Sequence, residues 1–197
     1  YQQQRNWKEA EEILLESLQI NSQQLHPRLE LSKIYQHQKK WGDAIRLLQE
    51  YIELDPEGLH PRTELSKIYQ HQKKWKEAEA VLQEALDINP EQLPSRTELS
   101  KIYQHQKKWD EAIRLLKEYI ALAPDGQHPR TELSKIYQQQ GKWKKAEDIL
   151  LESLRLEPNG LHPRTELGKI YQHQKRWPEA EKILWESINI EPDHMHP

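Results

Sequence analysis

The sequence predicts an all-α fold, an α-solenoid built from antiparallel helix pairs. Two observations lead to this prediction: the chain repeats itself every 34 residues, and each half of the repeat carries an apolar stripe of helical period. The composition agrees, since 35% of the 197 residues are hydrophobic and 31% are charged. Such a polar chain suits an elongated fold with a large surface better than one compact core.

The repeat is strongest in its first half. The segment Arg62–Trp75 recurs letter for letter as Arg96–Trp109, and close copies begin at Arg28, Arg130 and Arg164. Two residue types keep the same interval through the chain. They are the tryptophans Trp7, Trp41, Trp75, Trp109, Trp143 and Trp177 and the alanines Ala10, Ala44, Ala78, Ala112, Ala146 and Ala180.

Each repeat is predicted to form two helices. The first begins near His60-Pro61, because proline suits the first helical turn, and it carries an apolar stripe that includes Leu65 and Tyr69. The second begins around Trp75 and stops at Asn89-Pro90, because the residue before a proline is disfavoured in the helical region. Equivalent prolines end every second helix, at Pro56, Pro90, Pro124, Pro158 and Pro192, and glycines follow three of them, at Gly58, Gly126 and Gly160.

This pattern resembles the tetratricopeptide repeat. In a frame starting at Leu25, the signature positions of that family are matched by Leu31, Ser32, Tyr35, Trp41, Ala44, Leu48 and Pro56. The resemblance implies a right-handed superhelix, in which Ser32 and Ala44 lie where paired helices approach closely. It also implies that the first helices line a concave groove where ligands bind.

The chain departs from the family pattern at three positions. Arg28 and its equivalents stand where a large apolar residue is common, and Tyr51 and Tyr119 stand where a small one is usual. The repeat at Leu93 has Pro94-Ser95 in place of His-Pro, so its first helix is expected to start slightly differently.

The frame divides one solenoid domain into units. Residues 1–24 form a partial repeat, mainly a second helix, and residues 195–197 begin a further repeat. The complete repeats between them are 25–58, 59–92, 93–126, 127–160 and 161–194. Because the array is broken at both ends and no polar capping helix is visible, end-to-end self-association is an expectation.

Helical periodicity selects one face of the first helices as the candidate peptide-binding groove. In the second repeat, Thr63, Lys67, Gln70, His71 and Lys74 fall on an arc opposite Leu65 and Tyr69. Stacking the repeats adds the equivalent residues: Lys33, Gln36, His37, Thr97, Lys101, Gln104, His105, Lys108, Thr131, Lys135, Gln138, Thr165, Lys169, Gln172 and His173. We call Lys33, Lys67, Lys101, Lys135 and Lys169 the lysine ladder.

Charge is layered between the helices. Residues 59–75 carry four basic residues and one acidic residue, whereas residues 76–92 carry one basic and five acidic. The net charge of −3 for the chain therefore hides basic first helices and acidic second helices, and a groove with one sign of charge attracts ligands of the other.

Identity between repeats is also uneven. The segment Lys76–Asn89 matches Asp110–Ala123 at only Glu77, Ala78, Leu82 and Glu84, in contrast to the identical first helices that precede them. Uniform first helices suit a repetitive ligand such as an extended peptide backbone. Recent duplication or deliberate construction would leave the same pattern without any ligand.

Other chemistry has little support in the sequence. Ladder histidines one repeat apart are on the order of 10 Å from each other, too far to share a zinc ion. The chain has no cysteine, Gly-rich phosphate loop or nucleophile elbow, so neither an enzyme nor a cofactor is expected. The absence of a signal peptide, a membrane span and cysteines favours a cytoplasmic location.

The leading hypothesis is a non-catalytic scaffold that binds an extended, acidic peptide in a basic groove. A polyanion or nucleic-acid binder is the first alternative, opposed by the absence of an aromatic residue from the predicted groove face. The tryptophans are interpreted as core packing between repeats. An engineered or self-assembling repeat scaffold without a dedicated ligand is the second alternative.

Overall fold

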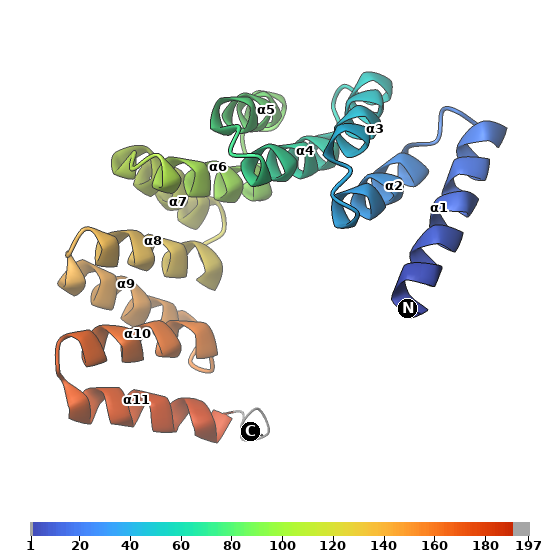
Figure 1. Ribbon diagram of the computed structural model, residues 1–197. Coiled ribbons are helices and arrows are strands. Elements are labelled where there is room, and N and C mark those ends of the chain that lie inside the picture. The colour runs from blue at the N-terminus through green and yellow to red at the C-terminus, as the bar shows by residue number, and fades with distance from the viewer. Residues whose placement is uncertain (1, 191–197) are drawn as a thin grey trace. The chain divides into compact units, whose positions relative to one another are not determined.

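The computed structural model describes residues 2–190, with side chains from Asn6 onward. These residues form eleven helices and no strand, so the predicted all-α fold class is confirmed. The helices are α1 (Gln2–Ile20), α2 (Leu25–His37), α3 (Trp41–Leu54), α4 (Leu59–His71), α5 (Trp75–Ile88), α6 (Leu93–His105), α7 (Trp109–Leu122), α8 (Gln127–Gln139), α9 (Trp143–Leu156), α10 (Leu161–His173) and α11 (Trp177–Ile190) (Figure 1).

The helix bounds follow the repeat. Described second helices end two residues before the predicted prolines, as α5 does at Ile88 before Pro90. Helix α6 begins at Leu93, the same repeat position as the other first helices, although Pro94-Ser95 replaces His-Pro. Pro192 and the expected start of a further repeat at residues 195–197 lie outside the described residues.

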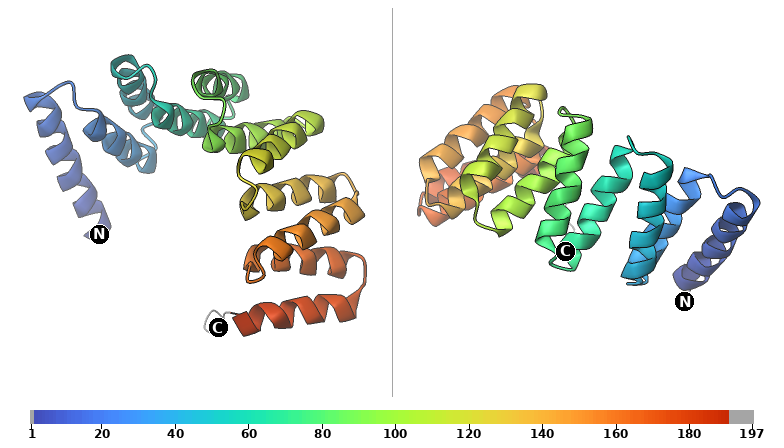
Figure 2. Two further views of the ribbon diagram at one scale, coloured as in Figure 1. Left: turned by 180° about the vertical axis from the view of Figure 1, so that it is seen from behind. Right: turned by 90° about the horizontal axis from the view of Figure 1, so that it is seen from above.

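The chain divides into two compact units within α6, one up to Ile102 and one from Tyr103 onward. In the first unit, α2 packs against α3 and α4 against α5, while contacts of α1 with α2 and of α3 with α4 join consecutive repeats. In the second unit, α8, α9, α10 and α11 lie side by side in that order (Figures 1 and 2).

The core of each repeat lies where its two helices meet. Ser32 and Ala44 have no exposed surface, and Leu31 and Leu48 beside them are at most 1% exposed. The Ser32 hydroxyl donates to the Leu29 carbonyl at 2.7 Å, so this small polar side chain is satisfied within its own helix. The small side chains therefore let the helix backbones approach, as the family resemblance implied.

Arginine at the fourth repeat position is a structural residue. Arg62 is 6% exposed, and its guanidinium donates to the Gly58 carbonyl at 2.7 Å and lies 3.6 Å from the Glu84 carboxylate. Arg130 repeats these contacts with Gly126 at 3.0 Å and Glu152 at 3.2 Å. The arginine thus joins the loop before a first helix to the second helix of the same repeat, which explains why a charged residue replaces an apolar one.

The joint, by which we mean the contact between the second helix of one repeat and the first helix of the next, is of two alternating kinds, apolar and polar. Ile45 and Tyr51 pack on the core between α3 and α4. The position of Ile45 is taken by Glu147 in α9, where it is 8% exposed. Glu147 accepts hydrogen bonds from the Tyr171 hydroxyl at 3.2 Å and from Arg176 at 3.0 Å. Ile113 packs on the core of the second unit, as Ile45 packs on that of the first. Glu11 follows the polar type and accepts a hydrogen bond from Gln38. Tyr51 and Tyr119 therefore both stand in repeats that carry isoleucine at this position.

The first helix of each repeat ends in a Schellman motif. In the first complete repeat, the Lys40 amide donates to the Tyr35 carbonyl at 2.8 Å and the Lys39 amide to the Gln36 carbonyl at 3.0 Å. Lys39 has a φ of 59°, in the left-handed region that favours glycine. Four lysines take this conformation: Lys39, Lys73, Lys107 and Lys175, whereas Gly141 takes it in the remaining complete repeat with a φ of 70°. We call these four residues the left-handed lysines.

We expect Lys73→Gly to stabilise the protein by about 1 kcal/mol, because a non-glycine residue in this region carries steric strain. The reciprocal Gly141→Lys should destabilise it by a similar amount. Urea denaturation followed by circular dichroism measures both effects. Equal midpoints for Lys73→Gly and the unmodified chain would contradict the strain assignment.

Candidate ligand-binding face of the first helices

The lysine ladder is paired with carboxylates on the same helices. Lys67 Nζ donates to Glu64 Oε1 at 2.7 Å, and Lys33 to Glu30 at 2.7 Å. The same contact, three residues apart, is made by Lys101 with Glu98, Lys135 with Glu132, and Lys169 with Glu166 at 2.7–2.8 Å. The lysine side chains remain between 36% and 60% exposed. The ladder is therefore accessible, but its positive charge is partly balanced by glutamates that the helical arc did not include.

The ladder glutamines connect some of these pairs along the face. Gln70 Nε2 donates to Glu98 Oε2 at 3.2 Å, and Gln138 Nε2 lies 3.5 Å from Glu166 Oε2. Gln36 Nε2 is buried and has no hydrogen-bond partner among the described residues. Glu98 and Glu166 thus each accept from a lysine of their own helix and from a glutamine of the preceding first helix.

The predicted threonines do not all face a ligand. Thr63, Thr97 and Thr131 are at most 8% exposed, and each hydroxyl donates to the carbonyl four residues earlier at 3.1–3.2 Å. Thr165 makes the same contact at 3.0 Å but is exposed. The first three threonines are therefore buried with their hydroxyls bonded within their own helices, and they offer a ligand little surface.

Among the described residues, ladder histidines contact tryptophan rings of the preceding repeat in three pairs, two of them stacked and the His37–Trp7 pair tilted. The ring centroids are 4.9 Å apart for His37 and Trp7, 5.7 Å for His71 and Trp41, and 3.9 Å for His173 and Trp143. The last two pairs have interplanar angles of 21° and 22°. Periodicity assigned the tryptophans to the core and the histidines to the groove. Their constant offset of 30 residues in the sequence was the signal that the two rings meet.

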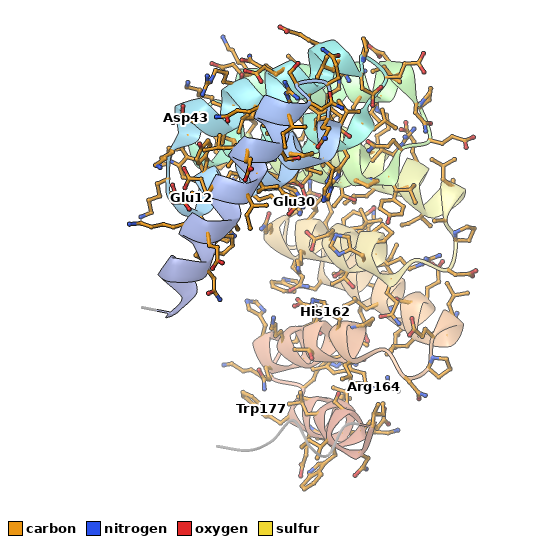
Figure 3. The ribbon with its side chains drawn as sticks, turned by 90° about the vertical axis from the view of Figure 1, so that its right-hand side faces the viewer. Glu12, Glu30, Asp43, His162, Arg164 and Trp177 are labelled. Carbon is orange, nitrogen blue, oxygen red and sulfur yellow. The ribbon has the colours of Figure 1, made fainter. Side chains whose placement is uncertain are left out.

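We call each of these pairs an aromatic rung. The histidines are exposed, while Trp41 and Trp143 are half-buried, so the imidazole lies outside and the indole supports it. Trp177 occupies the equivalent position of α11, where it is 60% exposed and projects from the first turn (Figure 3). Aromatic surface therefore lies on the face for which the sequence predicted no aromatic residue.

Lysines beside these rungs fall into two groups. Lys74 and Lys108 lie over Tyr69 and Tyr103, with Nζ 6.0 Å and 5.2 Å from the ring centroids. The left-handed lysines, in contrast, are all exposed and make no ion pair with any described residue. The uncompensated positive charge of this face is therefore concentrated at the C-terminal ends of the first helices.

An open pocket of about 520 Å³ lies between two rungs of the first unit. His37 forms one side, and Trp41 with His71 forms another. Its remaining lining consists of Lys33, Gln36, Lys39 and Glu64. We call this space the inter-rung pocket. It is large enough for one ligand side chain and combines ring surfaces with a charged rim.

The described residues give no indication of a metal site or a membrane span. No three histidine or carboxylate side chains in this part of the chain are grouped so as to hold a metal ion. No helix within it is long and apolar enough to cross a bilayer.

Family models confirm the resemblance found in the sequence. One model, described as tetratricopeptide repeat, matches residues 37–96, 69–130 and 103–162, and a second with the same description matches residues 164–190. The chain therefore belongs to the tetratricopeptide repeat family. A search of curated protein sequences finds no match. The family fold supports a role as a protein-interaction scaffold.

Solved structures with a similar fold share little sequence with the chain. YrrB, described as a tetratricopeptide repeat protein with an unusual peptide-binding site, is 17% identical over 92% of this chain and 94% of that one, with a TM-score of 0.61. PilF of Pseudomonas aeruginosa is 15% identical over 98% of this chain and 88% of that one, with a TM-score of 0.73. MamA of Desulfovibrio magneticus RS-1 is 14% identical over 87% and 97%, with a TM-score of 0.69. At these identities the likeness establishes the fold alone.

The ion pairs of this face affect stability as well as charge. Burial alone would raise the pKa of the Glu166 carboxyl, but the hydrogen bond and charge of Lys169, together with Gln138 and Lys135, hold that pKa below its ordinary value. A carboxyl whose pKa is lowered by folding contributes stability that is present above its unfolded value, about 4.3, and is lost as the pH falls through its folded value.

We therefore expect Glu166→Gln to lower stability at pH 7 and to reduce the further loss that acid causes below about pH 4.3. Urea midpoints at several pH values measure this dependence. Glu181→Gln is the matched control, because Glu181 is exposed and makes no ion pair with a described residue. If both variants keep the acid dependence of the unmodified chain, the assignment to Glu166 is wrong.

Proposed function

We propose that the chain is a non-catalytic interaction scaffold whose first helices bind an extended, acidic peptide segment. The observation that carries the proposal is a polar set on successive first helices: a lysine paired with a glutamate and a neighbouring glutamine in all five, and an exposed histidine in four. A regular spacing of like groups suits a ligand that is itself regular, and an extended peptide main chain has that property.

The source of the positive charge differs from the one that the sequence indicated. The lysine ladder shares its charge with Glu30, Glu64 and their equivalents, so it supplies hydrogen bonds more than net charge. The left-handed lysines supply unpaired charge at the helix ends. An acidic ligand is favoured because these cations are exposed and because the rim of the inter-rung pocket contains one of them, Lys39.

Hydrogen bonding to a main chain would come from the ladder. Lysine ammonium groups present donors at each repeat, and the glutamates paired with them present acceptors. The glutamine amides contribute less, because the Nε2 atoms of Gln36 and Gln104 are buried. Because both kinds of group are present, the face can satisfy the N–H and C=O groups of an extended peptide. Binding of this kind tolerates variation in ligand side chains, since the main chain is common to all of them.

Replacing all five ladder lysines by glutamine tests this proposal. We expect the affinity for a synthetic peptide of alternating glutamate and serine to fall by roughly ten- to a hundredfold, from the loss of several charged hydrogen bonds. Fluorescence anisotropy measures the affinity, and circular dichroism checks that helicity is kept.

The control variant replaces five exposed lysines of the second helices, Lys8, Lys76, Lys117, Lys144 and Lys182, by glutamine. It changes the net charge of the chain by the same amount, so a nonspecific effect of charge would weaken both variants alike. Unchanged affinity in the ladder variant would contradict binding on the first-helix face.

The aromatic rungs favour a second candidate, a single-stranded nucleic acid. Exposed rings beside lysines are the combination on which bases stack while phosphates meet cations. Affinity for single-stranded RNA should then fall steeply with increasing salt, because bound phosphates release counterions. A shallow salt dependence would exclude this candidate.

A further inference from the structure

Two residues change together along the array. In four repeats the first helix ends with a histidine followed two positions later by a left-handed lysine, as His37 and Lys39 show. In the remaining complete repeat, Gln139 and Gly141 stand at these two positions. The histidine and the left-handed lysine are thus present together or absent together within one molecule.

The turn itself does not need the lysine. The hydrogen bond that closes the motif is 2.8 Å long from Lys142 to Tyr137, where Gly141 makes the turn, and 2.8 Å from Lys40 to Tyr35, where Lys39 makes it. Glycine adopts the left-handed region freely, whereas lysine is strained there. The lysines are exposed and form no ion pair with described residues, so no ion pair in this part of the chain compensates for the strain. Strain of this kind, kept without a structural need, is typical of functional positions.

Beside three of the left-handed lysines, the histidine ring packs against a tryptophan ring of the preceding repeat. In the first unit, the His71 and Trp41 rings are stacked with centroids 5.7 Å apart. The inter-rung pocket contains this pair together with His37 and Lys39, the two residues that change in concert. The covarying pair and the ring surfaces therefore line one space.

We propose that the inter-rung pocket accepts an aromatic side chain of the bound peptide and that its left-handed lysine binds an acidic residue next to that side chain. The repeat with Gln139 and Gly141 is a spacer that lacks this acceptor. The inference rests on the proposed function in one respect, since it requires that a peptide lie on this face.

The chemistry of the pocket selects this partner. Imidazole and indole faces form offset or edge-to-face contacts with another aromatic ring, which contribute beyond the area they bury. Among the charged groups that line the pocket, Lys33 and Glu64 are each paired with a residue of their own helix, so the unpaired charge comes from Lys39 and disfavours a cationic side chain. The exposed ammonium of Lys39 has no partner among the described residues, so a carboxylate adjacent to the ligand ring complements it.

The test converts both rungs of the first unit to the spacer sequence, with His37→Gln, Lys39→Gly, His71→Gln and Lys73→Gly in one variant. Two synthetic peptides are the probes, one of alternating glutamate and tyrosine and one of alternating glutamate and serine. We expect the unmodified chain to prefer the tyrosine peptide by about three- to tenfold, the range that one aromatic contact provides. The converted variant should lose this preference and be no less stable to urea, because glycine relieves the strained turns.

A matched control replaces His37 and His71 by glutamine and Lys8 and Lys76, two exposed lysines of second helices, by glutamine. This variant retains the left-handed lysines, so it should lose the tyrosine preference but retain more affinity for both peptides than the spacer conversion does. The reciprocal variant, Gln139→His with Gly141→Lys, should bind the tyrosine peptide more tightly than the unmodified chain while unfolding at lower urea.

Each outcome decides between the two proposals. A tyrosine preference that survives in the converted variant overturns the pocket assignment. Equal binding of both peptides by the unmodified chain also overturns it, but leaves the proposed function standing if the ladder variant has lost affinity. Binding of neither peptide overturns both proposals, as does displacement of the peptides by single-stranded RNA at far lower concentration.

Discussion

The packing of each first helix against the second helix that follows depends on the small side chains at their crossing. Ser66 and Ala78 are fully buried, and larger side chains there would separate the backbones. Because the helices are this close, leucines such as Leu65 and Leu82 are almost completely buried. Two further contacts then set the geometry of the pair: the arginine that joins the preceding loop to the second helix, and the Schellman motif that reverses the chain between them.

The fold could be predicted from the sequence because every repeat reports on the same local structure. Leu65 and Tyr69 define a helical face in isolation, and Pro90 ends a helix wherever it stands. The role of Arg62 could not be predicted, because its partner Glu84 lies on another helix and its carbonyl acceptor lies in a loop. The left-handed conformation of Lys73 could not be predicted from the lysine itself. The indication in the sequence is Gly141 at the equivalent position, because glycine favours that conformation.

The candidate site was predictable in outline for the same reason. Helical period alone places Lys67, Gln70 and His71 on one side of α4, and their side chains are at least partly exposed. It does not reveal which positions of that side are buried in the packed repeats, and Thr63 is one of them. Nor does it reveal contacts between repeats, so the stacking of His71 on Trp41 required the structure. On the face of the first helices, most charges are therefore paired. The aromatic surface and the unpaired lysines lie at the C-terminal ends of these helices. Recognition on such a face depends more on the position of donors, acceptors and rings than on net charge.

The alternation of polar and apolar joints has a consequence for how the array can be shortened or extended. Glu147 is complemented by Tyr171 and Arg176, whereas Ile45 and Tyr51 are complemented by an apolar core. A buried carboxylate without its partners is costly, but the first helices supply those partners at either kind of joint. Tyr69 and Lys74, which follow the apolar joint of Ile45, hold the repeat positions of Tyr171 and Arg176. One first-helix surface can therefore receive either kind of second helix. The modular element of this protein, for recombination or for design, is a single repeat, and the kind of joint is set by its second helix.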